Sequence, residues 1–188
     1  RLGAEVLNFD AGSSSANKGE TAIDTLRNLE AMGVDCFVVR TGVDGELQAL
    51  AEAAKPGTHF INAGDGRSNH PTQALLDMLT IRQHKGPDFS GLKIVIAGDI
   101  LHSRVARSDI QALKQLGCGE IAVCGPDSLM PADGTLSGCK RVSDFNEAMQ
   151  GVDVVMMLRL QRERMEQGLV GSLEQYFSDY GLDADRLA

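Results

Sequence analysis

The fold is decided by residues 93–124, which read KIVIAGDILHSRVARSDIQALKQLGCGEIAVC. The apolar runs 93–97 and 120–124 have the length of buried strands, and apolar residues recur at helical spacing in 103–116 between them. Gly117 follows that segment, as is typical of a helix C-terminus. A strand, a helix and a second strand in this order predict a parallel pair of strands with a crossover helix.

The same alternation continues on both sides of this unit. We expect further helices over 21–32, 45–54, 71–84 and 144–150, and further strands over 4–9, 36–40, 59–63, 140–142 and 153–158. The sequence therefore predicts an α/β fold class: two three-layer parallel-sheet units joined by the long helix 71–84. The first unit is expected to span residues 1–84 and the second residues 85–188, and both are expected to be incomplete.

Composition excludes several classes of protein. The chain has 188 residues, with 18 Lys and Arg against 26 Asp and Glu, so its net charge of -8 predicts no general attraction to nucleic acid or to membrane surfaces. No apolar run approaches the roughly 20 residues that a membrane helix needs. Neither the four cysteines nor the four histidines stand at the spacing of a zinc site. We therefore expect reduced thiols, a cytoplasmic location and no metal.

Cationic side chains collect where the predicted strands end. In open parallel sheets, ligands bind past the carboxyl ends of the strands. The residues that follow strands in this way are Arg40, His70, Arg104 and Arg159. Their convergence predicts an anion-binding crevice on an otherwise acidic protein.

Each of these residues also has an ordinary interpretation. A strand-end arginine can be solvated or paired with an acid such as Asp99 or Glu163, and His70 can be a polar residue beside a helix N-terminus. The serine-rich segment that ends in Lys18 is not a Walker phosphate loop, because neither Ser nor Thr follows the lysine. Gly98 alone does not make the G-x-G-x-x-G pattern, which disfavours a dinucleotide-binding oxidoreductase.

Several short motifs, each weak by itself, follow one another along the chain. They are SSSANKGET at 13–21, VR at 39–40, NAGDG at 62–66, HPTQALLD at 70–77, GD at 98–99 with SRVARS at 103–108, and LRLQRER at 158–164. In this order they resemble the aspartate branch of the aspartate/ornithine carbamoyltransferase family. Ornithine enzymes share H-P-x-Q, whereas the serine-rich K-G-E segment and the R-x-Q-x-E-R run are similar to the aspartate branch.

The resemblance implies that the first unit binds carbamoyl phosphate and the second binds L-aspartate. The implied reaction transfers the carbamoyl group to the aspartate amine and gives N-carbamoyl-L-aspartate and phosphate, a step of de novo pyrimidine biosynthesis. Such a transfer needs positioned hydrogen-bond donors and cations, so no cofactor is expected.

The resemblance also implies roles for particular residues. His70 would donate a hydrogen bond to the carbamoyl oxygen, Gln73 would orient the carbamoyl amide, and Arg40 would hold the phosphate and the carbonyl oxygen. Arg104 and Arg159 would bind the two carboxylates of aspartate, which fit planar guanidinium groups. The remaining implied substrate-binding residues are Gln161, beside the aspartate amine, and Ser14 and Lys18, of which Lys18 also counts as catalytic.

Ser14 and Lys18 are implied to act in the site of a neighbouring subunit, so the resemblance implies a homotrimer with shared active sites. It leaves open a regulatory or dihydroorotase-like partner chain. The S-T-R-T and H-P-x-P loops of the family are not found in this sequence, and Thr41 follows Arg40 where the family commonly has His. We therefore expect these 188 residues alone to be inactive. The alternative is a catalytically inactive, carbamoyltransferase-like assembly or regulatory subunit, which the presence of every donor disfavours.

Overall fold

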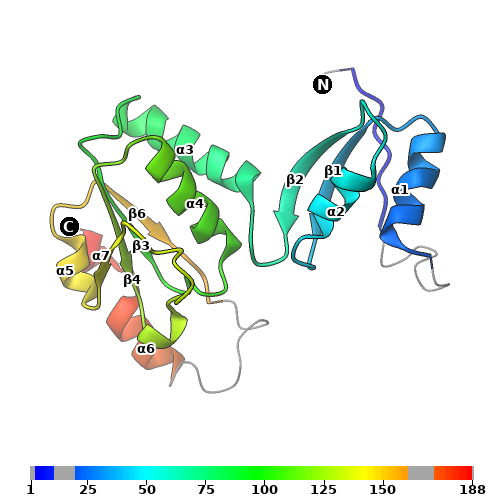
Figure 1. Cartoon of the computed structure of the whole chain (residues 1–188). Coiled ribbons are helices and arrows are strands. Elements are labelled where there is room, and N and C mark those ends of the chain that lie inside the picture. Colours follow the sequence, from blue (N-terminus) through cyan, green and yellow to red (C-terminus); the bar gives the residue numbers. More distant parts are fainter. Residues whose placement is uncertain (1–2, 11–19, 161–171, 188) are drawn as a thin grey trace.

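In the computed structural model, which describes residues 3–10, 20–160 and 172–187, helices alternate with strands along the chain (Figure 1). The first unit contains α1 (Ala22–Ala31), β1 (Cys36–Thr41), α2 (Glu46–Ala53) and β2 (His59–Asp65), and α3 (Pro71–Lys85) follows it. The second contains β3 (Lys93–Ala97), α4 (Arg104–Gln115), β4 (Glu120–Cys124), β5 (Lys140–Val142), α5 (Phe145–Met149), β6 (Val154–Met157), α6 (Leu173–Tyr180) and α7 (Ala184–Leu187).

The strands form two separate parallel sheets. In the first, β1 pairs with β2, and Cys36 lies opposite His59. In the second, the strand order is β5-β4-β3-β6, and every neighbouring pair is parallel. The prediction of an α/β fold with parallel sheets is confirmed. No helix among the described residues is both long enough and apolar enough to cross a membrane.

The second sheet has helices on both faces (Figure 1). On one face, Ile94 of β3 packs in a buried cluster with Met78 of α3 and Ile110 of α4. On the other face, Val95 packs with Phe145 of α5. Alternate residues of β3 thus enter opposite cores, which explains why this strand is apolar along almost its whole length.

The first sheet is covered on one face in the described residues. Phe37 and Phe60 are paired in register, and their rings stack with centroids 5.4 Å apart. On the opposite face, Val38 and Ile61 are also paired, and they are 67% and 44% exposed. This part of the first unit therefore has two layers rather than the expected three.

Residues 4–9 do not form a strand, so that prediction was wrong. Val6, Leu7 and Phe9 are all exposed, and no described strand pairs with this segment. Alternating apolar residues favour an extended backbone, but a strand also requires a hydrogen-bonded neighbour.

Side chains cap the N-termini of α1 and α4. Thr21 and Asp24 form a capping box at α1, in which each side chain accepts from the other's backbone N–H at 3.1 Å. Ser103 caps α4 by accepting from the Ala106 N–H at 3.1 Å. The Ser103 cap fixes the point at which α4 begins, and with it the position of Arg104, the first residue of that helix.

Candidate active site

Arg104 links the second unit to the first. It begins α4, but its Nη1 donates to the carbonyl oxygens of Thr41, at 3.2 Å, and Gly66, at 3.1 Å. The residue is buried, and its guanidinium occupies space beside Gly64, where an added Cβ would lie 2.6 Å from Cζ. Arg104 thus brings a positive charge from the second unit to the carboxyl ends of β1 and β2.

His70 shares this region with two arginines. Its backbone N–H donates to the Ser108 Oγ of α4 at 2.8 Å, and its Nδ1 lies 3.3 Å from the Thr72 Oγ1. Burial lowers the pKa of His70, and the positive charges of Arg104 and Arg40 lower this pKa further. The imidazole is therefore neutral at pH 7 and can donate a hydrogen bond without carrying a charge.

Gln73 lies one turn further along α3 than His70. Its Nε2 donates to the Asp77 Oδ1 at 3.0 Å. Because that bond fixes which end of the amide is the donor to Asp77, the carbonyl oxygen Oε1 is left to accept from a ligand. The side chain thus suits a ligand that carries an amide N–H.

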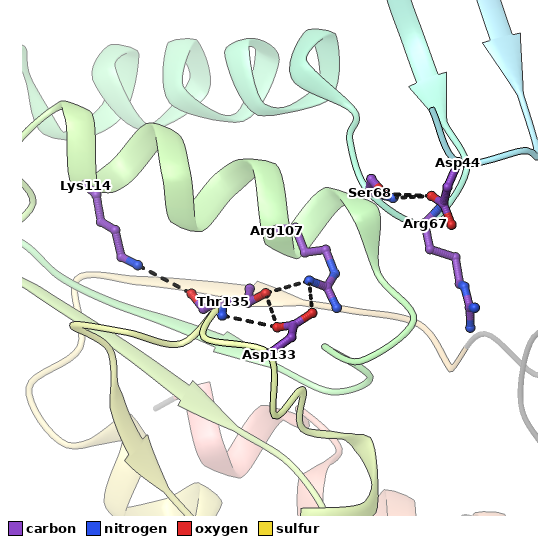
Figure 2. Close-up of polar contacts among 7 residues, drawn as sticks. All are labelled: Asp44, Arg67, Ser68, Arg107, Lys114, Asp133 and Thr135. Carbon is purple, nitrogen blue, oxygen red and sulfur yellow. Dashed lines mark hydrogen bonds and ion pairs between the residues drawn. The ribbon is translucent and has the colours of Figure 1, made fainter. Parts of the chain in front are cut away.

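The turn between β2 and His70 is held by Asp44 (Figure 2). The Asp44 Oδ1 accepts from the backbone N–H groups of Arg67, at 2.7 Å, and Ser68, at 3.1 Å, and from the Ser68 hydroxyl at 2.7 Å. The Ser68 hydroxyl bond, followed by the Arg67 backbone bond, lowers the pKa of Asp44. Figure 2 shows the Arg67 side chain directed away from Asp44. Gly66 has φ +47°, and a Cβ there would overlap the Asp44 side chain. The Asp44 side chain therefore holds the turn that leads to His70.

Arg107, one turn after Arg104 on α4, has a structural role (Figure 2). Its Nη1 donates to the Asp133 Oδ2 at 2.7 Å and to the Thr135 Oγ1 at 2.5 Å. The Thr135 hydroxyl, followed by Arg107, lowers the pKa of Asp133 to about 2. These contacts tie the loop after β4 to α4, which holds the helix that carries Arg104.

The structure places the predicted site residues as follows. Arg40, on β1, is exposed and acts electrostatically on His70 together with Arg104. Arg159 follows β6 and is also exposed. The backbone N–H of the preceding Leu158 donates to the Ala97 carbonyl oxygen, at the carboxyl end of β3, at 2.8 Å. The predicted residues Ser14, Lys18 and Gln161 lie outside the described residues.

Asp99, which was one possible acidic partner for a strand-end arginine, contacts His102. The Asp99 Oδ1 lies 2.9 Å from the His102 Nδ1 and accepts from the His102 backbone N–H at 3.2 Å, so this acid is engaged with a neighbour on its own loop. Glu163 lies outside the described residues. A surface hollow of about 380 Å³ opens between α2 and β2, but Arg40, His70 and Arg104 do not line it.

The motifs did not single out Asp44, and Ser108 is only one residue of the SRVARS motif, with no role assigned to it from the sequence. An Asp in a turn is a recognisable acceptor of backbone N–H groups, but the Asp44 partners are 23 and 24 residues away. Ser108 and His70 are 38 residues apart. Their importance depends on packing between elements, which local sequence does not specify.

The arrangement as a whole can bind an anion and polarise a carbonyl group. Guanidinium groups bind phosphate and carboxylate oxygens through charge-assisted hydrogen bonds. A neutral imidazole and an oriented amide can fix a carbonyl oxygen and an amide nitrogen. Within the described ranges, no three His, Cys, Asp or Glu side chains gather as they would around a metal ion.

Comparison with known proteins gives a consistent result. Residues 1–83 match the model of the aspartate/ornithine carbamoyltransferase carbamoyl-P binding domain. The whole chain is 69% identical to an aspartate carbamoyltransferase catalytic subunit of Stenotrophomonas maltophilia and covers 60% of that protein. The chain therefore spans about three fifths of the length of such relatives.

Solved structures share the fold. Aspartate transcarbamoylase from Trypanosoma cruzi in complex with carbamoyl phosphate superposes with a TM-score of 0.84 at 33% identity, over 99% of this chain and 61% of that one. The same enzyme in complex with N-(phosphonacetyl)-L-aspartic acid gives 0.76 at 34% identity, over 87% and 56%. Residues 1–83 thus match a domain of the aspartate/ornithine carbamoyltransferase family, and the whole chain is similar in sequence and in fold to aspartate carbamoyltransferases.

Proposed function

We propose that the protein containing this chain is an aspartate carbamoyltransferase, which transfers the carbamoyl group of carbamoyl phosphate to the L-aspartate amine in pyrimidine biosynthesis. The observation that carries the proposal is Arg104 of α4, which lies at the strand ends of the first unit and acts on His70 together with Arg40. Residues 1–84 would bind carbamoyl phosphate, in agreement with the domain matched by 1–83, and residues 85–188 would bind aspartate.

The first half of the site suits carbamoyl phosphate, which carries about two negative charges and a carbonyl group. Arg40 would bind the phosphate and the carbonyl oxygen. His70, kept neutral by burial and by the two arginines, would donate to the same oxygen in the tautomer that has its proton on Nε2 and whose Nδ1 accepts a hydrogen bond from the Thr72 hydroxyl. Gln73 would accept from the carbamoyl amide through Oε1, since its Nε2 is bonded to Asp77.

The reaction follows from these contacts. The aspartate amine attacks the carbamoyl carbon, and the carbonyl oxygen becomes an oxyanion. The C–O bond to phosphate then breaks as the carbonyl re-forms, and the departing phosphate takes the proton that the amine nitrogen loses. The His70 hydrogen bond and the arginine charges stabilise the oxyanion and the departing phosphate more than they stabilise the neutral carbonyl. The residues therefore lower the barrier by positioning and electrostatics.

The second half of the site would bind the acceptor. Aspartate carries two carboxylates, and a pair of arginines can bind both. Arg104 is held in place by Thr41 and Gly66, whereas Arg159 is exposed at the end of β6. Arg159 would therefore be the more adjustable of the two, and Gln161 would position the amine.

We also propose that the protein works as a cytoplasmic homotrimer in which Ser14 and Lys18 complete a neighbouring site. The four cysteines are all free, which suits a reducing compartment. Sedimentation of the full-length protein at micromolar concentration tests the assembly, and a monomer under all conditions would contradict it. A mixture of inactive Lys18→Ala and His70→Ala proteins would regain activity if sites are shared.

The activity is tested by offering carbamoyl phosphate to the full-length protein with L-aspartate, with L-ornithine or with no acceptor. Mass spectrometry should detect N-carbamoyl-L-aspartate in the first reaction only. Citrulline from ornithine would assign the protein to the other branch. No product from either acceptor would instead support the inactive assembly or regulatory subunit. The His70→Ala variant is the control for contaminating activity.

A further inference from the structure

A carboxyl group is buried directly behind the candidate site. Asp109 of α4 is 0% exposed, and neither of its carboxylate oxygens receives a hydrogen bond from the described residues. The group that faces it is the carboxyl of Asp77, on the neighbouring helix α3. Figure 1 shows these two helices packed along one another.

Two ionised carboxylates in this position would repel one another, and the burial of Asp109 limits the screening of that repulsion by solvent. One proton shared between them removes the repulsion and converts one oxygen into a hydrogen-bond donor. Burial raises the pKa of Asp109 to about 8, with the charge of Asp77 as the next cause. Asp109 is therefore the member of the pair that carries the proton at pH 7.

The pair is connected to the site through two short paths. The Asp77 Oδ1 accepts from the Gln73 Nε2 at 3.0 Å. Ser108, which precedes Asp109 on α4, accepts from the His70 backbone N–H at 2.8 Å. The first contact is made by Asp77, a member of the pair. The second is made by Ser108, which lies on the same turn of α4 as Asp109.

Other charged groups near the pair are engaged elsewhere. Arg104 and Arg107 share α4 with Asp109, but Arg104 bonds to Thr41 and Gly66, and Arg107 bonds to Asp133. On α3, the charged group that faces Asp109 is Asp77, and the His70 contact with α4 is made through its backbone N–H. The protonation of Asp109 is therefore set by its burial and by its interaction with Asp77.

We propose that Asp109 is a positioning residue, which in its protonated form donates to Asp77 and thereby orients Gln73 with its amide oxygen toward the carbamoyl group. This role rests on the proposed function. Asp77 can serve both partners because its two oxygens can accept from the Gln73 amide and from the Asp109 hydroxyl at the same time. Ionisation of Asp109 would replace the second bond with a repulsion.

Two substitutions separate this role from simple packing. Asp109→Asn keeps a donor of the same shape that cannot ionise, and Asp109→Leu keeps the volume but removes the donor. Asp88→Asn, at an exposed carboxyl on the loop before β3, is the matched control. All are made in the full-length protein, together with wild type.

Infrared spectroscopy tests the shared proton without requiring turnover. The spectrum of wild type at pH 7 should contain the carbonyl band of a protonated carboxylic acid, which should be absent from Asp109→Asn and Asp109→Leu and present in Asp88→Asn. Absence of that band from wild type would overturn the proposal. Because this readout needs no activity, it stands even if the proposed reaction fails.

Calorimetric titration with carbamoyl phosphate tests the positioning. The affinity of wild type for carbamoyl phosphate should fall as pH rises through about 8. Asp109→Asn should not show that fall. Asp109→Leu should bind carbamoyl phosphate about tenfold more weakly at pH 7, because Asp77 would lose the hydrogen bond from Asp109. Wild-type affinity in Asp109→Leu, or the same pH dependence in wild type and Asp109→Asn, would overturn the role.

Discussion

Arg104 donates from Nη1 to the Thr41 carbonyl oxygen at 3.2 Å, although the two residues belong to different units of the fold. The bond joins the first turn of α4 to the end of β1. A cation that the second unit positions therefore acts on the imidazole of the first. The candidate site therefore depends on how the two units pack, and Arg104 is a side chain that bonds directly from one unit to the other.

Replacement of Gly64 should disturb Arg104 directly. Gly64 has φ +128°, and its added Cβ would lie 2.6 Å from the guanidinium carbon. Gly64→Ala should lose more stability than the roughly 1–3 kcal/mol of backbone strain alone, and it should raise the KM for aspartate. Urea unfolding and steady-state kinetics provide the two measurements.

Gly57→Ala is the matched control for this prediction. Gly57 has φ +94°, so an alanine is strained there too, but nothing lies within 4 Å of the added Cβ. Its KM for aspartate should stay at the wild-type value. Equal stability losses and equal KM values in the two variants would show that contact with Arg104 is unimportant.

The imidazole of His70 should titrate below its ordinary value of 6.5, because burial and the charges of Arg104 and Arg40 disfavour the protonated form. In an NMR pH titration, Arg40→Ala should raise the midpoint, whereas Arg82→Ala, at the far end of α3, should not. On the acid side of neutral pH, activity should fall only when the pH drops below that lowered pKa. A wild-type midpoint above 6.5, or one insensitive to Arg40, would be incompatible with the cluster described.

Stability should depend on pH through Asp109. The folded protein keeps this proton up to about pH 8, whereas the unfolded chain loses it near the ordinary value of 3.8. Between these values the unfolded state binds fewer protons, so stability falls as pH rises. Relative to Asp109→Asn, wild type should lose at most about 1.4 kcal/mol per pH unit in this window. Parallel stability curves in urea unfolding would rule this out.

Arg159→Ala should separate the two substrates. If Arg159 binds an aspartate carboxylate, its loss should raise the KM for aspartate by about tenfold or more, as removal of a charged hydrogen bond predicts. Binding of carbamoyl phosphate in the absence of aspartate should remain within about twofold of wild type, a difference of less than about 0.5 kcal/mol. Equal losses for both substrates would mean that Arg159 has been assigned to the wrong half of the site.

Local signals in the sequence predicted most of the secondary structure. The capping box of Thr21 and Asp24 and the apolar run of β3 act within a few residues, so the sequence contains what is needed to locate them. The prediction of a strand over 4–9 was wrong because a strand also needs a partner strand, which is distant in sequence. For the same reason, the sequence predicted that Arg104 lies near a ligand, but not that it crosses to Thr41, 63 residues away.

The acid pair shows the same limit for the site. Asp77 lies inside the HPTQALLD motif, but nothing local indicates that Asp109 faces it from another helix. Burial is set by how α3 packs on α4, and only burial makes a shared proton favourable. The motifs thus indicated the groups that we propose contact the ligand more readily than the groups that hold them in place.

The central claim is that arginines from both units serve one site for carbamoyl phosphate and aspartate. The most direct measurement is calorimetric titration of the full-length protein with N-(phosphonacetyl)-L-aspartic acid, which joins an analogue of the first substrate to the second. Wild type should bind one molecule per chain, and both Arg40→Ala and Arg159→Ala should weaken binding by about tenfold or more. No binding by wild type, or binding that is insensitive to either arginine, would contradict the account.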